Sequence, residues 1–209
     1  MSKRPLVNRR NQSGYKQRAV GTRDVRERFL IVCEGERTEP NYFKCFRVPK
    51  EVLDVRGLGY NTVSLVKKAI DLRNQDSYDQ VWCVFDKDSW PAKNFNEALS
   101  LAKREGIKVA YSNEAFEIWY LLHFNYHTTA ITRSGCCDKL SELLGKKYKK
   151  NQEDMYALLE AKQSIAIRNA SKLLSRYTPR NPEQDNPSTK VHVLVEQLNR
   201  FARPQPKSA

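Results

Sequence analysis

Two aspartates separated by a single residue, Asp86 and Asp88, directly follow the apolar run VWCVF. A continuous apolar run of this length is typical of a strand that is covered on both faces of a sheet. Carboxylates at the end of such a strand have two common roles, since they either cap the following turn or bind a divalent metal ion. The spacing alone does not choose between these roles, so the positions of other acids become informative.

Two more acids are expected at the same edge of the predicted sheet. Glu34 directly follows the apolar run RFLIVC, and Glu117 lies near the start of a helix that follows the strand pattern IKVAY. Because ligands of an open parallel sheet bind outside the carboxyl ends of its strands, these two acids and the aspartate pair are expected to face one edge. Four carboxylates repel one another unless a cation neutralises them, and oxygen ligands of this kind suit Mg²⁺ or Mn²⁺.

Each of these acids also has a purely structural interpretation. Asp86 and Asp88 could cap the next turn, and Glu34 could stabilise a helix N-terminus through the helix dipole. Glu117 could lie on the surface of an amphipathic helix. Taken singly, the structural interpretation is preferred for all of them except Asp86. The combination of Glu-Gly after one strand and DxD after another favours the metal site.

Strand and helix patterns alternate four times up to about Phe124, which predicts an α/β fold with a doubly wound, mainly parallel sheet of about four strands. The helix after the fourth strand is expected to begin at a cap formed by Ser112 or Asn113. Beyond residue 130 the pattern is helical, without a strand signal. The predicted parts are a basic flexible arm (1–27), an α/β core (28–128), a helical C-terminal extension packed on the core (129–203) and a frayed tail (204–209).

The formal net charge is +13 and its distribution is uneven. Residues 1–28 hold nine Lys or Arg against two acids, with too little apolar content to order alone. A second basic cluster is KKYKK (146–150), for which a solvated helix end is the preferred interpretation. Because basic arms attract polyanions through counterion release, nucleic acid is the expected partner. The residues expected to contact it are Arg4, Arg9, Arg10, Lys16, Arg18, Lys146, Lys147, Lys149 and Lys150.

The cysteines, the hydropathy and the absence of several known motifs limit the cellular location and the classes of activity that the sequence supports. The five cysteines are an odd number without a CxxC pair, which predicts a reduced, cytoplasmic protein. No stretch approaches the roughly 18 uncharged apolar residues of a membrane helix, so no membrane partner is expected. The sequence contains no P-loop, GxGxxG or GxSxG motif, so ATP hydrolysis and serine-based acyl transfer have no support.

The strand–EG–helix and strand–DxD elements resemble a Toprim domain, the metal-binding fold shared by topoisomerases, bacterial primases and OLD-type nucleases. More closely, the chain resembles the RloB-like family over roughly residues 28–200. The resemblance is specific because several separated blocks occur in the family's order. The blocks are IVCEGERTEPNYF, VWCVFDKDSW, FNEALSLAKREGIKVAYSNEAFEIWYLLHF and NPSTKVHVLVEQL.

The resemblance implies a Toprim-like fold and a role in bacterial phage defence and abortive infection, commonly beside an RloA-type ATPase. It also implies that Glu34, Asp86 and Asp88 hold Mg²⁺, with Glu117 as a further ligand. OLD-type sites have a second acid shortly after the glutamate that follows the first strand. Glu39 is the nearest candidate for that acid in this sequence, and Glu36 competes with it.

The leading hypothesis is a nuclease that uses Mg²⁺ or Mn²⁺ to cleave DNA or RNA. In this hypothesis Asp86 and Asp88 anchor the metal, and Glu34 either shares it or acts as a general base, which makes these three residues catalytic. The alternative is a non-catalytic adaptor or sensor that binds nucleic acid and docks an ATPase. The sequence does not choose DNA over RNA, one metal over two, or a monomer over a homo-oligomer.

Overall fold

The computed structural model describes residues 27–88 and 92–202 and shows an α/β fold built on one five-stranded sheet. The strand order is β2-β1-β3-β4-β5, in which the first four strands are parallel and β5 is antiparallel to β4. The strands are β1 (Phe29–Cys33), β2 (Leu53–Gly57), β3 (Gln80–Asp86), β4 (Lys108–Asn113) and β5 (Ser188–Thr189). The frayed tail, and the predicted arm apart from Glu27, lie outside the described residues.

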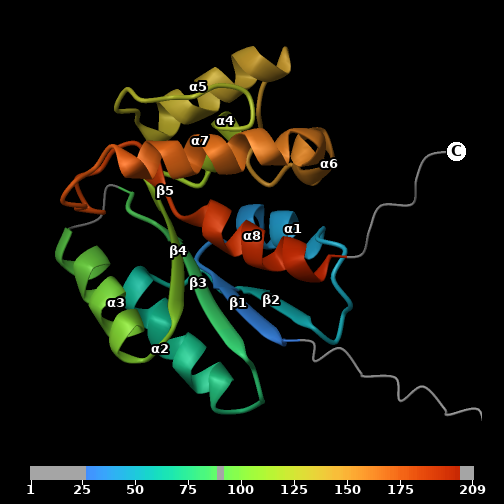
Figure 1. Cartoon of the computed structure of the whole chain (residues 1–209), viewed down its shortest axis with the longest axis vertical. Coiled ribbons are helices and arrows are strands. Elements are labelled where there is room, and N and C mark those ends of the chain that lie inside the picture. Colours follow the sequence, from blue (N-terminus) through green and yellow to red (C-terminus); the bar gives the residue numbers. More distant parts are fainter. Residues whose placement is uncertain (1–26, 89–91, 203–209) are drawn as a thin grey trace, which may run out of the picture.

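Helices cover both faces of the sheet and also gather at one end of it (Figure 1). Helices α2 (Thr62–Arg73) and α3 (Ala92–Arg104) pack on one face, while α1 (Thr38–Lys44) and α8 (Val191–Phe201) pack on the other. The remaining helices lie near the end of β4 in Figure 1. They are α4 (Glu117–Leu121), α5 (Arg133–Leu144), α6 (Met155–Leu159), a short 3-10 helix η1 (Glu160–Lys162) and α7 (Gln163–Ser175).

The central strands are buried on both faces, as their continuous apolar sequences predict. All five residues of β1 are buried, and they alternate between two hydrophobic clusters. Leu30 and Val32 face α2 and α3, whereas Ile31 and Cys33 face the cluster that includes α1 and α8. This period-2 alternation sets the register of β1 between β2 and β3, and it fixes where each strand delivers its carboxyl end.

The predicted mainly parallel sheet and its four parallel strands are confirmed, but the expectation of no strand beyond residue 130 is wrong. Ser188 and Thr189 form β5 and pair with Asn113 and Ser112 at the end of β4. The hydroxyl groups of Ser112 and Thr189 are 3.1 Å apart, so side chains reinforce this short ladder. Two small polar residues have no hydrophobic period, so sequence patterns do not reveal such a strand.

The expected helix cap at Ser112 or Asn113 is also wrong, because both residues belong to β4. Asn113 uses its side-chain amide to donate to the carbonyl oxygens of Pro182 and Glu183, at 2.9 and 3.0 Å. The helix α4 begins only at Glu117, without a side-chain cap at Phe116. Because β4 extends to Asn113 and α4 begins only at Glu117, Glu117 lies close to the carboxyl end of the sheet. In the described part of the chain, no helix is both long and apolar enough to cross a membrane.

Candidate functional site

Arg133 is the residue around which the acids of the DxD motif are arranged. It is the first residue of α5, and its Nη2 atom lies 3.0 Å from Asp86 Oδ2 and 2.9 Å from Asp88 Oδ2. Asp86 is the last residue of β3, so the strand itself points this carboxylate at the end of the sheet. One guanidinium group therefore joins both aspartates.

The backbone after β3 turns so that Asp88 faces the same site. Asp88 has a φ of +46°, a conformation that aspartate tolerates better than most other residues. The turn is held against the next strand by two hydrogen bonds, from Lys87 N to Ser112 O at 2.7 Å and from Asp88 N to Glu114 O at 3.1 Å. Asp88 thus serves the turn and the charge cluster together.

Glu34 enters the site from the neighbouring strand. Because β1 and β3 are adjacent and parallel, Glu34 follows β1 beside the end of β3, and Asp86 N donates to Glu34 Oε2 at 3.2 Å. The pKa of Glu34 is raised to about 7, mainly by burial and also by repulsion from Glu39 and Asp88, while the hydrogen bond from the Asp86 amide and the charge of Arg133 oppose the shift. A half-buried carboxyl with this pKa exchanges a proton near neutral pH.

Asp86 is the most confined acid of the group. Only 6% of its surface is exposed, and burial raises the pKa of its carboxyl well above the usual range. Glu39, Glu117 and Glu34 raise this pKa further by repulsion, and Arg133 lowers it. The Oδ1 atom of Asp86 is buried without a hydrogen-bond partner among the described residues. A buried oxygen of this kind calls for a cation, a proton or a donor that binding brings.

Glu39, in the first turn of α1, faces the cluster, and Glu36 does not. Glu39 is 6% exposed and its pKa is raised by burial, with Glu117 adding repulsion, whereas Glu36 is exposed. Gly35 makes this possible, because a Cβ atom at that position would lie only 2.0 Å from Glu39 Oε2. The glycine of the EG motif therefore makes room for the second acid.

Glu117 is held at the site by a residue from the KKYKK segment. Glu117 is the first residue of α4 and is 3% exposed, and the hydroxyl of Tyr148 donates to its Oε1 at 3.3 Å. Tyr148 is itself buried, so it anchors the segment. The four lysines around it are exposed, and Lys150 is near enough to lower the pKa of Glu39.

The predicted nucleic-acid contacts divide into two groups. Arg4, Arg9, Arg10, Lys16 and Arg18 lie outside the described residues. Lys146, Lys147, Lys149 and Lys150 follow α5 and are exposed, and Lys146 lies 3.5 Å from Asp154. The interpretation of KKYKK as a solvated helix end accounts for the exposed lysines but not for the buried Tyr148.

Sequence reasoning missed Arg133 and the role of Tyr148. Arg133 follows Thr132, whose side chain accepts from Gly135 N and caps α5, so the sequence marks only a helix start there. Tyr148 stands in a basic run that reads as solvent-exposed. The burial of Tyr148, and the contact between Arg133 and Asp86, which are 47 positions apart, become visible only in the folded chain.

The donor set fits a hard divalent cation such as Mg²⁺ or Mn²⁺, because it consists of carboxylates and includes the unpartnered Asp86 Oδ1. As they stand, these side chains do not form a coordination shell. Within residues 27–88 and 92–202, no group of three or more His, Cys, Asp or Glu is arranged to hold a metal ion. The positive charge at Asp86 and Asp88 is that of Arg133.

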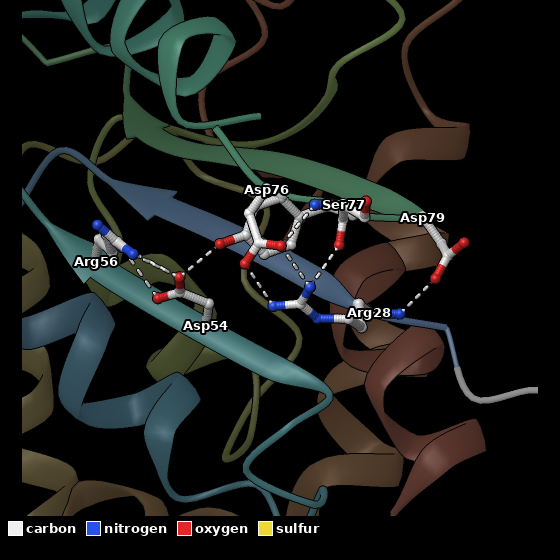
Figure 2. Close-up of polar contacts among 7 residues, drawn as sticks. Arg28, Asp54, Arg56, Asp76, Ser77 and Asp79 are labelled. Carbon is white, nitrogen blue, oxygen red and sulfur yellow. Dashed lines mark hydrogen bonds and ion pairs between the residues drawn. The ribbon is translucent and has the colours of Figure 1, made fainter. Parts of the chain in front are cut away.

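A second charged group, the Arg28 cluster, lies at the opposite end of β1 and β3 (Figure 2). Arg28 donates through both terminal nitrogens to the Asp76 carboxylate at 2.9 and 2.8 Å, and also to Ser77 O. Asp54 is bound by Arg56 on β2 in the same view. These ion pairs are solvent-exposed, so each acid has both a cation and water.

Comparisons with known proteins identify one family. A family model described as RloB-like protein matches residues 29–198. No curated protein and no solved structure matches the chain.

Proposed function

The chain belongs to the RloB-like protein family, and from this premise we propose that it is a Toprim-type, Mg²⁺-dependent nuclease that hydrolyses phosphodiester bonds of DNA or RNA. The observation that carries the proposal is the buried Asp86, whose Oδ1 lacks a hydrogen-bond partner among the described residues while other carboxylates crowd around it. Such a cluster is suited to bind a divalent cation and, through it, a phosphate group.

The arrangement of the strands supports the Toprim-like assignment. Glu34 after β1 and the DxD motif after β3 are far apart in sequence, but β1 and β3 are neighbours and parallel in the sheet. Both motifs therefore end at the same edge, where an open parallel sheet binds its ligands. Glu39 and Glu117 join them from the first turns of α1 and α4.

The proposed roles follow from burial and charge. Asp86 and Asp88 anchor the metal, and Glu117 and Glu39 are further ligands. Bound Mg²⁺ supplies Lewis-acid polarisation of the scissile phosphate and lowers the pKa of bound water. Glu34 either shares the metal or takes a proton from the attacking water, and its pKa of about 7 is matched to the second role near neutral pH.

Arg133 and the lysines are the cationic part of the proposed site. Arg133 has to share its two aspartates with the metal, or leave them and bind a phosphate oxygen of the substrate, for which its guanidinium group is suited. In this proposal the exposed lysines Lys147, Lys149 and Lys150 contact flanking phosphates, and Lys150 is near enough to Glu39 to lower its pKa. The arginines and lysine named above in residues 1–26 would add contacts that do not depend on base sequence.

The biological setting is proposed from the family alone. We place the nuclease in bacterial phage defence and abortive infection, working with an RloA-type ATPase. The RloB-like family membership supports this assignment, and the site chemistry is compatible with either DNA or RNA.

The nuclease proposal is tested by cleavage assays on DNA and RNA with the full chain, in a titration of Mg²⁺ and Mn²⁺. Asp86→Asn and Asp88→Asn should each lower the cleavage rate by at least about a hundredfold, because each removes a metal-binding charge. Asp76→Asn is the matched control, since Asp76 is also bound to an arginine but lies at the other end of the sheet. Cleavage without metal, or full activity in both site variants, would contradict the proposal.

The ion pairs of Arg133 favour a second candidate function. If Arg133 is the permanent partner of Asp86 and Asp88, the cluster is structural and the chain is a nucleic-acid-binding adaptor or sensor of an ATPase complex. Isothermal calorimetry with Mn²⁺ distinguishes the two functions. Absent or weak metal binding, together with no cleavage in the presence of an RloA-type ATPase, supports the adaptor.

A further inference from the structure

The outer edge of β4 is open at the start of the strand, around Val109. The two residues of β5 pair only with Ser112 and Asn113, and the chain then turns into α8. The peptide groups of Tyr111 point toward this outer edge, because Lys190 N donates to Tyr111 O at 2.8 Å. Residues two apart in a strand direct their peptide groups to the same edge, so the N–H and C=O of Val109 face outward as well. In the described chain, no strand of the sheet pairs with them.

A groove of about 460 Å³ lies at this edge and is lined by residues of α3, of β4 and of the segment at the start of α8. Its walls combine two kinds of side chain. Leu99 from α3, Val109 from β4 and Val193 from α8 are half-buried apolar residues. Lys103, Lys108 and Lys190 supply one amine from each of the same three regions. The described residues that line the groove include no acid.

The charge of the groove is not balanced locally. Within residues 27–88 and 92–202, neither Lys103 nor Lys190 forms an ion pair, and Lys108 donates to the neutral oxygen Gln80 Oε1 at 2.9 Å. Lys190 is half-buried, which is costly for an unpaired charge. An acidic occupant would relieve that cost.

We propose that this edge groove, made by Leu99, Lys103, Lys108, Val109, Lys190 and Val193, docks an extended acidic segment of a partner protein. The segment would add as a strand beside β4, hydrogen-bond to Val109 through its main chain and place acids against the three lysines. This is β-strand addition, in which the main chain provides affinity and alternate side chains provide specificity. The inference does not depend on the proposed nuclease activity.

Charge also argues against the other occupants of the groove. Residues 1–26 contain eight Lys or Arg and one acid, and residues 203–209 contain two and none. These segments of the chain would be repelled by the lysines. A second copy pairing β4 with β4 would bring both sets of lysines into one interface, where like charges oppose association.

A designed peptide tests the proposal on the full chain. The probe is a fluorescein-labelled dodecapeptide of three Glu-Glu-Val-Val repeats, which as a strand shows both acids and valines on each face. Fluorescence anisotropy should show saturable binding, whereas a Lys-Lys-Val-Val peptide should not bind. Two peptides with N-methyl groups on alternate residues, one for each register, keep the charge but block one row of main-chain donors. At least one of them should bind about tenfold more weakly.

Charge reversal in the groove gives the second measurement. Lys103→Glu/Lys190→Glu should weaken binding of the acidic peptide by at least about tenfold. Lys67→Glu/Lys93→Glu is the matched control, because it makes the same charge change at exposed positions on α2 and α3 and should leave binding unchanged. Thermal melts of both variants establish that they are folded, and Lys103→Gln/Lys190→Gln replaces the reversal if it is not.

Several results would overturn the proposal. They are the absence of saturable binding, binding of both N-methylated peptides as tight as that of the unmethylated peptide, and equal weakening by the groove and control variants. Sedimentation of the wild-type chain adds one more: a dimer that Lys103→Glu/Lys190→Glu alters would assign the edge to a second copy. Peptide binding that appears only after deletion of residues 1–26 would assign it to the chain's own arm.

Discussion

Arg28 and Arg133 each bind aspartates at opposite ends of the same two strands, but the surroundings give those aspartates opposite properties. The Arg28 hydrogen bonds lower the pKa of Asp76 to about 2, since that carboxylate is solvated and paired (Figure 2). Burial raises the pKa of Asp86 well above its usual range, although Arg133 is 3.0 Å away. An arginine–aspartate pair therefore favours the charged aspartate where it is exposed to water, whereas burial and neighbouring acids disfavour the charged aspartate inside the acid cluster.

The difference supports the carboxyl end of the strands as the proposed functional site. At the Arg28 cluster each acid has its cation, so nothing further is needed there. At the carboxyl end, one arginine is shared by two aspartates, and three glutamates stand within electrostatic reach. Burial opposes the charged form of Arg133, but the surrounding acids outweigh it and raise the pKa of its guanidinium group. This unbalanced end of the sheet is the one suited to recruit a cation.

The largest expected effect comes from removing each arginine. Arg133→Gln leaves Asp86 buried without its cation, so the free energy of unfolding in chelator should fall by on the order of 3 kcal/mol. Arg28→Gln leaves an aspartate, Asp76, that is already exposed to water, so its effect should be much smaller. Urea unfolding of both variants measures the difference. Millimolar Mn²⁺ should restore much of the loss in Arg133→Gln but none in Arg28→Gln, and equal losses in the two variants would remove the distinction.

The pH dependence of Glu34 should be the next largest effect. Glu34 keeps its proton up to about pH 7 in the folded chain, whereas the unfolded chain releases it near the ordinary glutamate pKa of 4.5. Between these values the folded state binds more protons, so stability falls as pH rises. Glu34→Gln should remove on the order of 2 kcal/mol of this fall, as measured by urea unfolding from pH 4.5 to 8. The exposed acid Glu36 provides a control, as Glu36→Gln should keep the parental slope.

The same titration predicts how metal affinity depends on pH. Protons and a divalent cation compete for Glu34, so Mn²⁺ binding should strengthen as pH rises through about 7. Calorimetry on the parent and Glu34→Gln measures this coupling. A parent whose Mn²⁺ affinity is the same at pH 6 and pH 8 would show that Glu34 is not part of the metal site.

Neutralising one aspartate at each end should give changes of opposite sign. Asp86→Asn relieves repulsion from Glu39 and Glu117 while Arg133 keeps Asp88, so stability in chelator at pH 8 should rise by about 1 kcal/mol. Asp76→Asn removes the favourable partner of Arg28 and should lower stability slightly. Melting curves with chelator and with Mn²⁺ separate the roles further, because metal should stabilise the parent but not Asp86→Asn. A loss of stability in chelator would identify Asp86 as a structural ion-pair partner.

The comparison also explains what the sequence could predict. Strands β1, β3 and β4 are continuous or alternating apolar runs, and their carboxyl ends locate Glu34 and Asp86 by topology alone. β5 was missed because two polar residues have no period. Arg133 was missed because its contact with Asp86 depends on how α5 packs over the ends of the strands. That Glu39 rather than Glu36 faces the acid cluster depends on the close approach of Glu39 to the backbone of Gly35, which the sequence does not show.

The smallest expected effect concerns Tyr148, which links the basic segment to the acid cluster. Tyr148→Phe removes the hydroxyl that donates to Glu117 and should lower the free energy of unfolding by about 1 kcal/mol. The aromatic ring still fills its site, so the segment should stay in place. If Glu117 binds metal, loss of this donor should also change Mn²⁺ affinity, measurable by calorimetry.

Tyr78→Phe is the matched control, since its hydroxyl donates to Asp54 at 2.8 Å beside the Arg28 cluster. A change in Mn²⁺ affinity of the same size in both variants would show that Glu117 has no special link to the metal, whereas a change confined to Tyr148→Phe would extend the site to the KKYKK segment.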